Sequence, residues 1–368
     1  MKNTYPALYY SDYLELDKIL SAQNPKSKEY TGKLAHDEVL FIIIHQTYEL
    51  WFKQILHELN TVAAIFEEDY VHERNIGVAL ARVRRVLEIF KVLNSQMNII
   101  ETMTPMDFLD FRDYLSPASG FQSFQFRLVE NKLGLKAEHR NSFDKSAYYS
   151  RLNPEHQKLV LETEKHPSLL ELVERWLERT PFLEFGNNFN FWESYQATVN
   201  KIQESDRLTI ENNPTLSENE KKAELAEFEN TMKSFASLFD EKKHQELAQK
   251  GLRKISLKAT RAGLLINLYR DEPILHLPFE FLTALIDLDE LMTNWRYAHS
   301  MMVNRMIGSK IGTGGSSGHH YLRGTADNHK VFSDFTNLAT FLVPRSQLPE
   351  LPQDVKQNLG FYYKKDNK

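Results

Sequence analysis

Apolar residues recur along most of the chain at the spacing of an α-helix, and the chain lacks runs of short alternating segments with hairpin turns. Residues 37–66 are apolar almost all round over their first turns, which is typical of a helix buried in a large core. Further long helices are predicted over about residues 78–103 and from Pro278 to Gly308, because proline suits the start of a helix and glycine its end. The pattern therefore predicts an all-α fold.

Capping residues divide the middle of the chain into shorter helices. In residues 104–107, "TPMD", the threonine suits the cap, the proline the first position and the aspartate the third position of a new helix. That helix should end at the small-residue turn 116–120. The chain then resumes as "FQSFQFRLVENKLG", for which Gly134 is the expected end. A tight turn thus separates two helices rich in aromatic residues.

Residues 205–250 are densely charged and contain a capping box formed by Ser217 and Glu220. We interpret this segment as an inserted, solvated helical hairpin, remote from any chemistry. Neither an internal repeat nor a low-complexity linker divides the chain. We therefore expect residues 1–368 to form a single domain.

Composition and charge narrow the functional classes. The 368 residues are 42% hydrophobic and 26% charged, as in a folded globular protein. A net charge of −5 gives no electrostatic attraction to nucleic acid or to an anionic membrane, so neither is expected as a main partner. A basic-then-apolar signal region and an uncharged apolar run of about 18 residues are both missing, which favours a cytoplasmic protein.

The chain contains no cysteine. This excludes disulfides, thiolate nucleophiles, cysteine-ligated zinc and iron–sulfur clusters. A haem could not be attached through a Cys-x-x-Cys-His motif either, so any transition metal must rely on histidine or carboxylate.

Near the N-terminus, a helix is predicted to begin at about Ser11, a plausible cap. Tyr10, Tyr13, Leu14 and Asp17 then fall on one stripe of that helix. A stripe of this kind needs a surface to cover.

The glycine-rich stretch "GSKIGTGGSSGHHYLRG", residues 308–324, does not match the known nucleotide-binding motifs. Its glycines give G-x-G-x-x-x-G after a helix, whereas a dinucleotide fingerprint needs G-x-G-x-x-G after a strand. It lacks the Gly-Lys-Ser/Thr end of a P-loop, and its paired histidines do not have zinc spacing. Two interpretations remain, a flexible loop or a loop whose backbone approaches a ligand beside Thr313.

Polar residues within apolar helices are candidates for chemistry. His45 lies one turn after Phe41, and it is either a satisfied core histidine or an acid–base group in a phenylalanine-lined pocket. His299 shares a helical face with methionines and Trp295, which suits a core histidine or an axial haem ligand. Arg112 shares a helical face with Phe108 and could pack there by its stem, form a local ion pair, or bind a substrate carboxylate through its planar fork.

Long motifs connect these residues. The chain from about residue 9 to residue 344 resembles the tryptophan 2,3-dioxygenase family in "HDEVLFIIIHQTYELWFKQIL", "ETMTPMDFLDFRDYLSPASGFQSFQFRLVENKLG", "WLERTPFLE", "SLFDEKKH", "LMTNWRYAH" and "GSKIGTGGSSGHHYLR". Motifs of this length and order are highly specific. The resemblance implies a large all-helical haem-binding domain, a homotetramer with one heme b per subunit, ferrous in the active form.

The same resemblance implies an activity. Members of the family use O2 to cleave the indole C2–C3 bond of L-tryptophan, giving N-formyl-L-kynurenine, the first step of the kynurenine route. Alternatives are a related haem dioxygenase for a substituted indole and a haem and tryptophan sensor without turnover.

Roles for individual residues follow from their matches to the family. His299 matches the proximal iron ligand, and His45 matches the distal histidine that meets the indole N–H as a base or as an orienting group. Phe41 and Phe108 match the walls around the indole. The remaining matches are Arg112 for the substrate carboxylate, Thr313 for the substrate ammonium, Ser119 and Gly120 for the turn over the distal face, and Trp295 and Tyr321 near the haem edge.

Tyr10, Tyr13 and Leu14 match an N-terminal segment that, in the family, reaches into the neighbouring subunit's active site. The neighbouring subunit would then be the surface that the N-terminal stripe covers. His319 departs from the family, where an aromatic residue is common, and the departure concerns the packing of the glycine-rich stretch.

Overall fold

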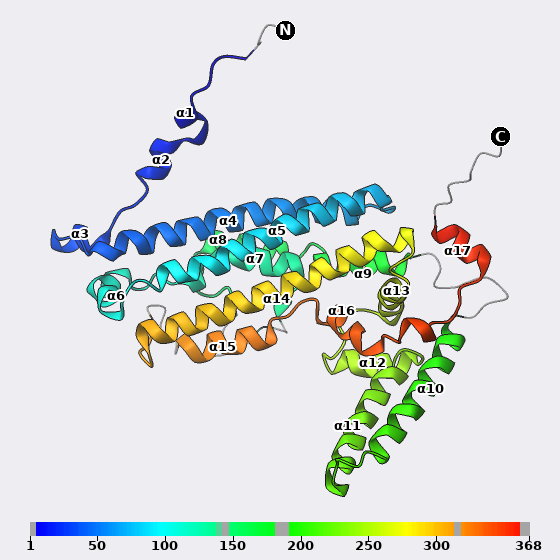
Figure 1. Cartoon of the computed structure of the whole chain (residues 1–368). Coiled ribbons are helices and arrows are strands. Elements are labelled where there is room, and N and C mark those ends of the chain that lie inside the picture. The colour runs from blue at the N-terminus through cyan, green and yellow to red at the C-terminus, as the bar shows by residue number, and fades with distance from the viewer. Residues whose placement is uncertain (1–4, 138–139, 141–146, 181–190, 313–317, 361–368) are drawn as a thin grey trace.

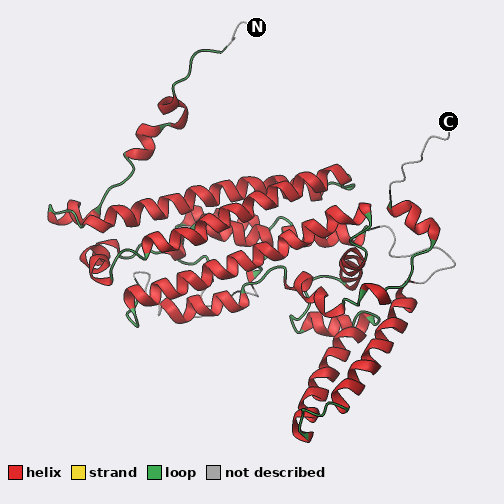
Figure 2. Ribbon diagram, in the orientation of Figure 1, coloured by secondary structure: helices red, strands yellow, loops and turns green. Residues whose placement is uncertain are grey.

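The computed structural model describes residues 5–137, 140, 147–180, 191–312 and 318–360. Within these ranges the regular structure is helical and contains no strand (Figure 2). The predicted all-α fold is confirmed. In this part of the chain, no helix has the length and apolar character needed to cross a membrane.

Three long helices form the body of the molecule. They are α4 (His36–Glu67), α5 (Glu73–Ile100) and α14 (Pro273–Ile307), and they run side by side in Figure 1. Their facing sides are buried, with Ile55, Val83 and Leu285 fully inaccessible to solvent. Each such side chain contributes roughly 1.5–3 kcal/mol by leaving water. The apolar pattern along α4 and α14 is therefore explained by their central position.

Shorter helices surround this body. They are α3 (Lys26–Thr31), α6 (Pro105–Arg112), α7 (Phe124–Leu133), α8 (Pro154–Thr163), α9 (Leu169–Glu178), α12 (Glu241–Gln249), α13 (Leu257–Leu268), α15 (Gly318–Asn328), α16 (Ser333–Asn337) and α17 (Gln353–Leu359), with short 3-10 turns that include Asp113–Leu115 and Gly120–Gln122. α15 packs along the second half of α14, and α7 packs against α4 (Figure 1). These contacts bring α4, α7, α14 and α15 around one region of the interior.

The predicted helix ends in the middle of the chain are confirmed. Thr104 and Asp107 form a capping box at the start of α6, with the Asp107 carboxylate accepting from the Thr104 backbone N–H at 3.1 Å. Gly134 ends α7 with a φ of +126°, and Gly308 ends α14 with a φ of +57°. Both values lie where side chains other than glycine are strained.

Two predicted helix starts are wrong. α14 begins at Pro273, not at Pro278, which lies inside the helix. Both prolines follow the pattern of a helix start, but Leu275 between them is buried, and this burial extends the helix back by more than a turn. α5 begins at Glu73 rather than near residue 78, with His72 as its cap.

The N-terminal segment also differs from its prediction. Ser11 lies inside α1 (Tyr10–Leu14) and is not its cap, and Glu15 interrupts the helix with a φ of +49°. Asp17 therefore belongs to α2 (Leu16–Leu20), so the predicted stripe is broken between two short helices. Both helices lead away from the body of the molecule (Figure 1).

A helical hairpin is present, with bounds that differ from those predicted. It consists of α10 (Phe191–Glu211) and α11 (Glu218–Ala236), which project from the body together (Figure 1). The capping box of Ser217 and Glu220 starts α11 as expected. The hairpin begins earlier than residue 205 because the first turns of α10 bury Phe191 and Tyr195 in the main core.

Candidate functional site

A cavity of about 280 Å³ lies among α4, α5, α7, α14 and α15. Most of its wall is aromatic or aliphatic. Residues singled out from the sequence that line it are Phe41, His45, Phe108, Arg112, Ser119, Gly120, Trp295 and His299. These side chains come from segments far apart in the chain, and the fold brings them to one cavity. Concave, mostly apolar sites with few polar groups are typical of cofactor and small-molecule sites.

His45 is a neutral hydrogen-bond acceptor in this geometry. Its Nδ1 lies 2.7 Å from the backbone oxygen of Phe41, and because a carbonyl only accepts, Nδ1–H is the donor. His45 is accessible from the cavity, but the protein packed around its ring reduces its hydration and so lowers its pKa, although the Phe41 carbonyl and Glu49 act in the opposite direction. The neutral ring thus has Nε2 free to accept a proton or a hydrogen bond.

Aromatic rings form one wall beside His45. The Phe41 ring lies 4.1 Å from the His45 ring and 5.7 Å from the Phe108 ring, measured between centroids. Behind them, the buried Phe111 packs edge-on against both phenylalanines. Packing of this kind fixes the ring planes, so the wall can hold a flat aromatic ligand.

Arg112, the last residue of α6, places its guanidinium at the cavity, and only some of the N–H groups have hydrogen-bond partners in the described part of the chain. Its Nη2 donates to the backbone oxygen of Ile311, and its Nη1 lies 3.8 Å from the Asp113 carboxylate. Its buried Nε–H has no partner among the described residues. The guanidinium therefore has capacity left for a further acceptor. Gly312, next to Ile311, also lines the cavity.

His299 and Trp295 lie one turn apart on α14. Their rings stack at a centroid distance of 5.3 Å with an interplanar angle of 18°. Burial lowers the pKa of His299 to about 4, and His45 adds to this effect. His299 makes no hydrogen bond to the described residues, so its neutral imidazole presents a nitrogen without a protein partner. Met302, Val303 and Met306, expected on the same helical face, line the cavity as well.

Other predicted site residues lie elsewhere or cannot be placed. Thr313 lies outside the described residues, and of His319 and Tyr321 only the backbone, in α15, is described. Tyr10 and Tyr13 are 74% and 71% exposed and, with Leu14, do not line the cavity of their own chain.

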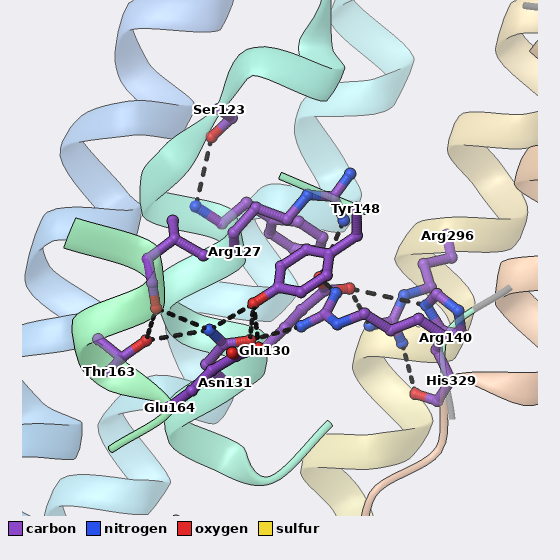
Figure 3. A network of polar contacts seen from close by, with 12 residues as sticks. Ser123, Arg127, Glu130, Asn131, Arg140, Tyr148, Thr163, Glu164, Arg296 and His329 are labelled. Atoms are coloured by element: carbon purple, nitrogen blue, oxygen red, sulfur yellow. Dashed lines mark hydrogen bonds and ion pairs between the residues drawn. The ribbon is translucent and has the colours of Figure 1, made fainter. Parts of the chain in front are cut away.

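A group of polar residues along the cavity was not predicted from the sequence. Arg127, Glu130, Arg296 and His329 line it and interact with one another (Figure 3). Arg127, Glu130 and Arg296 lie in helices predicted from the sequence, whereas His329 follows α15, which was not predicted. A charged residue on an otherwise apolar helical face is the signal that could have found them.

Comparisons with known proteins show which family the chain belongs to. A sequence profile of the tryptophan 2,3-dioxygenase family matches residues 2–342. The chain is 53% identical to the tryptophan 2,3-dioxygenase of Bdellovibrio bacteriovorus over 359 residues, which is 98% of this chain and 99% of that protein. It is 50% identical to the tryptophan 2,3-dioxygenase of Mus musculus over 346 residues, 94% of this chain and 84% of that protein. Similarity at this level across nearly the whole length shows that the chain belongs to the tryptophan 2,3-dioxygenase family.

Proposed function

We propose that this protein uses haem and O2 to cleave the C2–C3 bond of the indole ring of L-tryptophan, giving N-formyl-L-kynurenine. One observation carries the proposal. His45, Phe41, Phe108 and Arg112 lie around one cavity that His299 also lines. This set can hold an aromatic amino acid and an iron porphyrin together.

The residues present fit a haem. Within the described residues no cluster of histidine and carboxylate side chains could hold a bare metal ion. A haem needs only one ligand from the protein, and the neutral imidazole of His299 would hold its iron. Trp295 stacks on that imidazole and restricts its orientation. Bound in this way, haem would supply the activation of O2 and the oxidation of the indole.

The chain's own residues bind and orient tryptophan. The guanidinium of Arg112 pairs with the substrate carboxylate, and Thr313 is proposed to contact the ammonium group. Phe41 and Phe108 hold the indole between apolar surfaces, which also exclude water from the reacting ring. Nε2 of His45 accepts the hydrogen bond of the indole N–H and thereby fixes the orientation of the indole ring.

A second copy of the chain completes the site in this proposal, within a homotetramer. Tyr10, Tyr13 and Leu14 would cover the neighbouring subunit's cavity. The N-terminal segment supports this because its large apolar side chains are exposed in the single chain; they include Tyr5, Leu8, Tyr9, Tyr10, Tyr13 and Leu20. Clustered exposed apolar residues are typical of a surface that a partner covers. A cytoplasmic location is part of the proposal and can be tested by fractionating cells.

The test combines haem binding with turnover. Haem-reconstituted protein is reduced without oxygen, then given L-tryptophan and air, while the Soret band and the near-ultraviolet absorbance of N-formylkynurenine are followed. We expect product from the wild type and none from His299→Ala. His244→Ala is the matched control, because His244 is buried but does not line the cavity.

Other outcomes separate the alternatives. Faster turnover of a ring-substituted tryptophan than of tryptophan would assign a substituted indole as the substrate. Binding of haem and tryptophan without product would favour a sensor. A protein that binds no haem would refute the proposal entirely.

A further inference from the structure

Glu130 is a buried carboxylate that joins separate helices beside the cavity (Figure 3). It is 1% exposed, and its Oε2 accepts from Nη1 of Arg127 at 2.9 Å and from Nη1 of Arg140. Its Oε1 accepts from Nη2 of Arg296 at 2.9 Å. Burial alone would raise the pKa of Glu130, but Arg140, Arg127 and Arg296, with His329 nearby, together hold it well below its usual range. The group is therefore a fully charged carboxylate.

Stability alone is a weak reason for burying this cluster. The cost of removing charges from water commonly equals or exceeds the attraction between them, and apolar residues of similar size are often as stabilising. Buried ionic groups are best attested as devices that hold one packing arrangement. The partners of Glu130 indicate which arrangement is held here.

Arg296 connects that carboxylate to two other parts of the fold. It lies on α14, and its Nη2 donates to Glu130 on α7. Its Nη1 donates to the backbone oxygen of His329, just after α15, at 2.9 Å. A planar guanidinium that makes both bonds leaves little freedom for its own helix. α14 is thus held against α7 and against the end of α15 at this level.

Arg296 and His299 lie at neighbouring positions along α14. Arg296 precedes His299 by three residues, so their side chains lie on adjacent turns of one helical side, and both line the cavity. A rotation of α14 by about 10° would move an atom about 6 Å from the helix axis by roughly 1 Å. Displacements of that size weaken a precisely placed ligand. The contact of Arg296 therefore bears directly on where the His299 imidazole lies.

We propose that Glu130 is a positioning residue, which fixes the rotation of α14 through Arg296 and so sets the His299 imidazole in the cavity. The proposal rests on the proposed function, in which His299 holds the haem iron. Glu130 acts in it only through Arg296.

Two variants test the connection from opposite ends. Glu130→Gln keeps the size of the side chain and removes its charge. Arg296→Lys keeps the charge but cannot span the carboxylate and the His329 carbonyl as a fork does. Glu58→Gln is the matched control, because Glu58 is 2% exposed and pairs with Arg85 at 2.9 Å but does not line the cavity.

The measurements use the haem-loaded full-length protein. Resonance Raman spectroscopy of the reduced form reports the iron–histidine stretch, and transfer of haem to an excess of a scavenging apoprotein reports its rate of loss. We expect a shifted or broadened iron–histidine band in both site variants, with haem lost about tenfold faster or more. Glu58→Gln should lower thermal stability while it leaves the band and the rate of haem loss unchanged.

An unchanged band and an unchanged rate in both site variants would overturn the inference and leave Glu130 as an ion pair that only supports the fold. If Glu130→Gln does not fold, Arg296→Lys decides the question by the same two measurements. A wild type without an iron–histidine band, or a band that persists in His299→Ala, would refute the proposed function and this inference with it. A normal wild-type band that neither site variant alters refutes the inference alone.

Discussion

Replacing Arg112 by leucine isolates the contact between the protein and the substrate carboxylate. The Arg112 side chain is 18% exposed, its Nη2 donates to the Ile311 carbonyl, and its Nε–H has no partner among the described residues. A hydrogen bond to a charged group contributes about 1.5–3 kcal/mol. At 1.4 kcal/mol for each factor of ten, the variant should bind L-tryptophan about 10- to 100-fold more weakly.

The same substitution should change the stability of the fold little. Within the protein, the substitution removes the hydrogen bond to the backbone of Ile311, which corresponds to about 1 kcal/mol, and a long ion pair with the exposed Asp113, which contributes little. The free energy of unfolding from denaturant titration checks this. A much larger loss of stability would mean that the guanidinium supports the fold and would undermine the interpretation of the binding data.

Binding is measured by titrating reduced, haem-loaded protein with ligand without oxygen, and it is compared for L-tryptophan and tryptamine. Tryptamine lacks the carboxylate, so its affinity should be the same in wild type and Arg112→Leu. Arg112→Lys should lie between them for L-tryptophan, because a lysine offers the charge without the fork. Equal weakening of both ligands, or an unchanged affinity for L-tryptophan, would refute the assignment of Arg112.

Further predictions concern pH and the fold. Protonation of His45 removes the acceptor at Nε2. We therefore expect kcat/KM to be constant above the ordinary histidine pKa and to fall only as the pH drops through the lowered pKa of His45. A decline that begins above pH 6.5 would contradict this. Glu38 is fully buried and accepts two backbone N–H groups at the start of α3, at 2.6 and 3.0 Å. Glu38→Ala should cost about 1–3 kcal/mol in a denaturant titration, whereas Glu29→Ala, on the exposed side of the same helix, should cost much less. Gly134→Ala should destabilise more than Gly32→Ala: both glycines have positive φ, but a Cβ at Gly134 would lie 3.0 Å from a leucine Cβ, and a Cβ at Gly32 meets nothing within 4 Å. Equal losses would show that the close contact relaxes.

Local chemistry explains which features of the fold could be predicted from the sequence. The capping box at Thr104 and Asp107 and the glycine ends at Gly134 and Gly308 are made by neighbouring residues, so their patterns appear in a short stretch of chain. The start of α14 could not be predicted in this way. Two prolines matched the same pattern, and burial of the residues between them decided which one begins the helix.

For the candidate site, the sequence by itself determined which helical faces carry chemistry. Phe41 and His45 are one turn apart, as are Trp295 and His299, and helical periodicity alone places each pair on one face. Resemblance to a family then attached expected roles to these residues. Neither source says how the faces of different helices meet.

Only the tertiary structure determines how these helical faces pack against one another. The packing of α4, α7 and α14 closes one cavity around His45 and His299, and it pairs Glu130 with Arg296. A buried carboxylate needs cationic partners, but the sequence does not specify which of the chain's many arginines will reach it. That choice depends on the rotation and spacing of whole helices, which arise from the sum of many apolar contacts along their length.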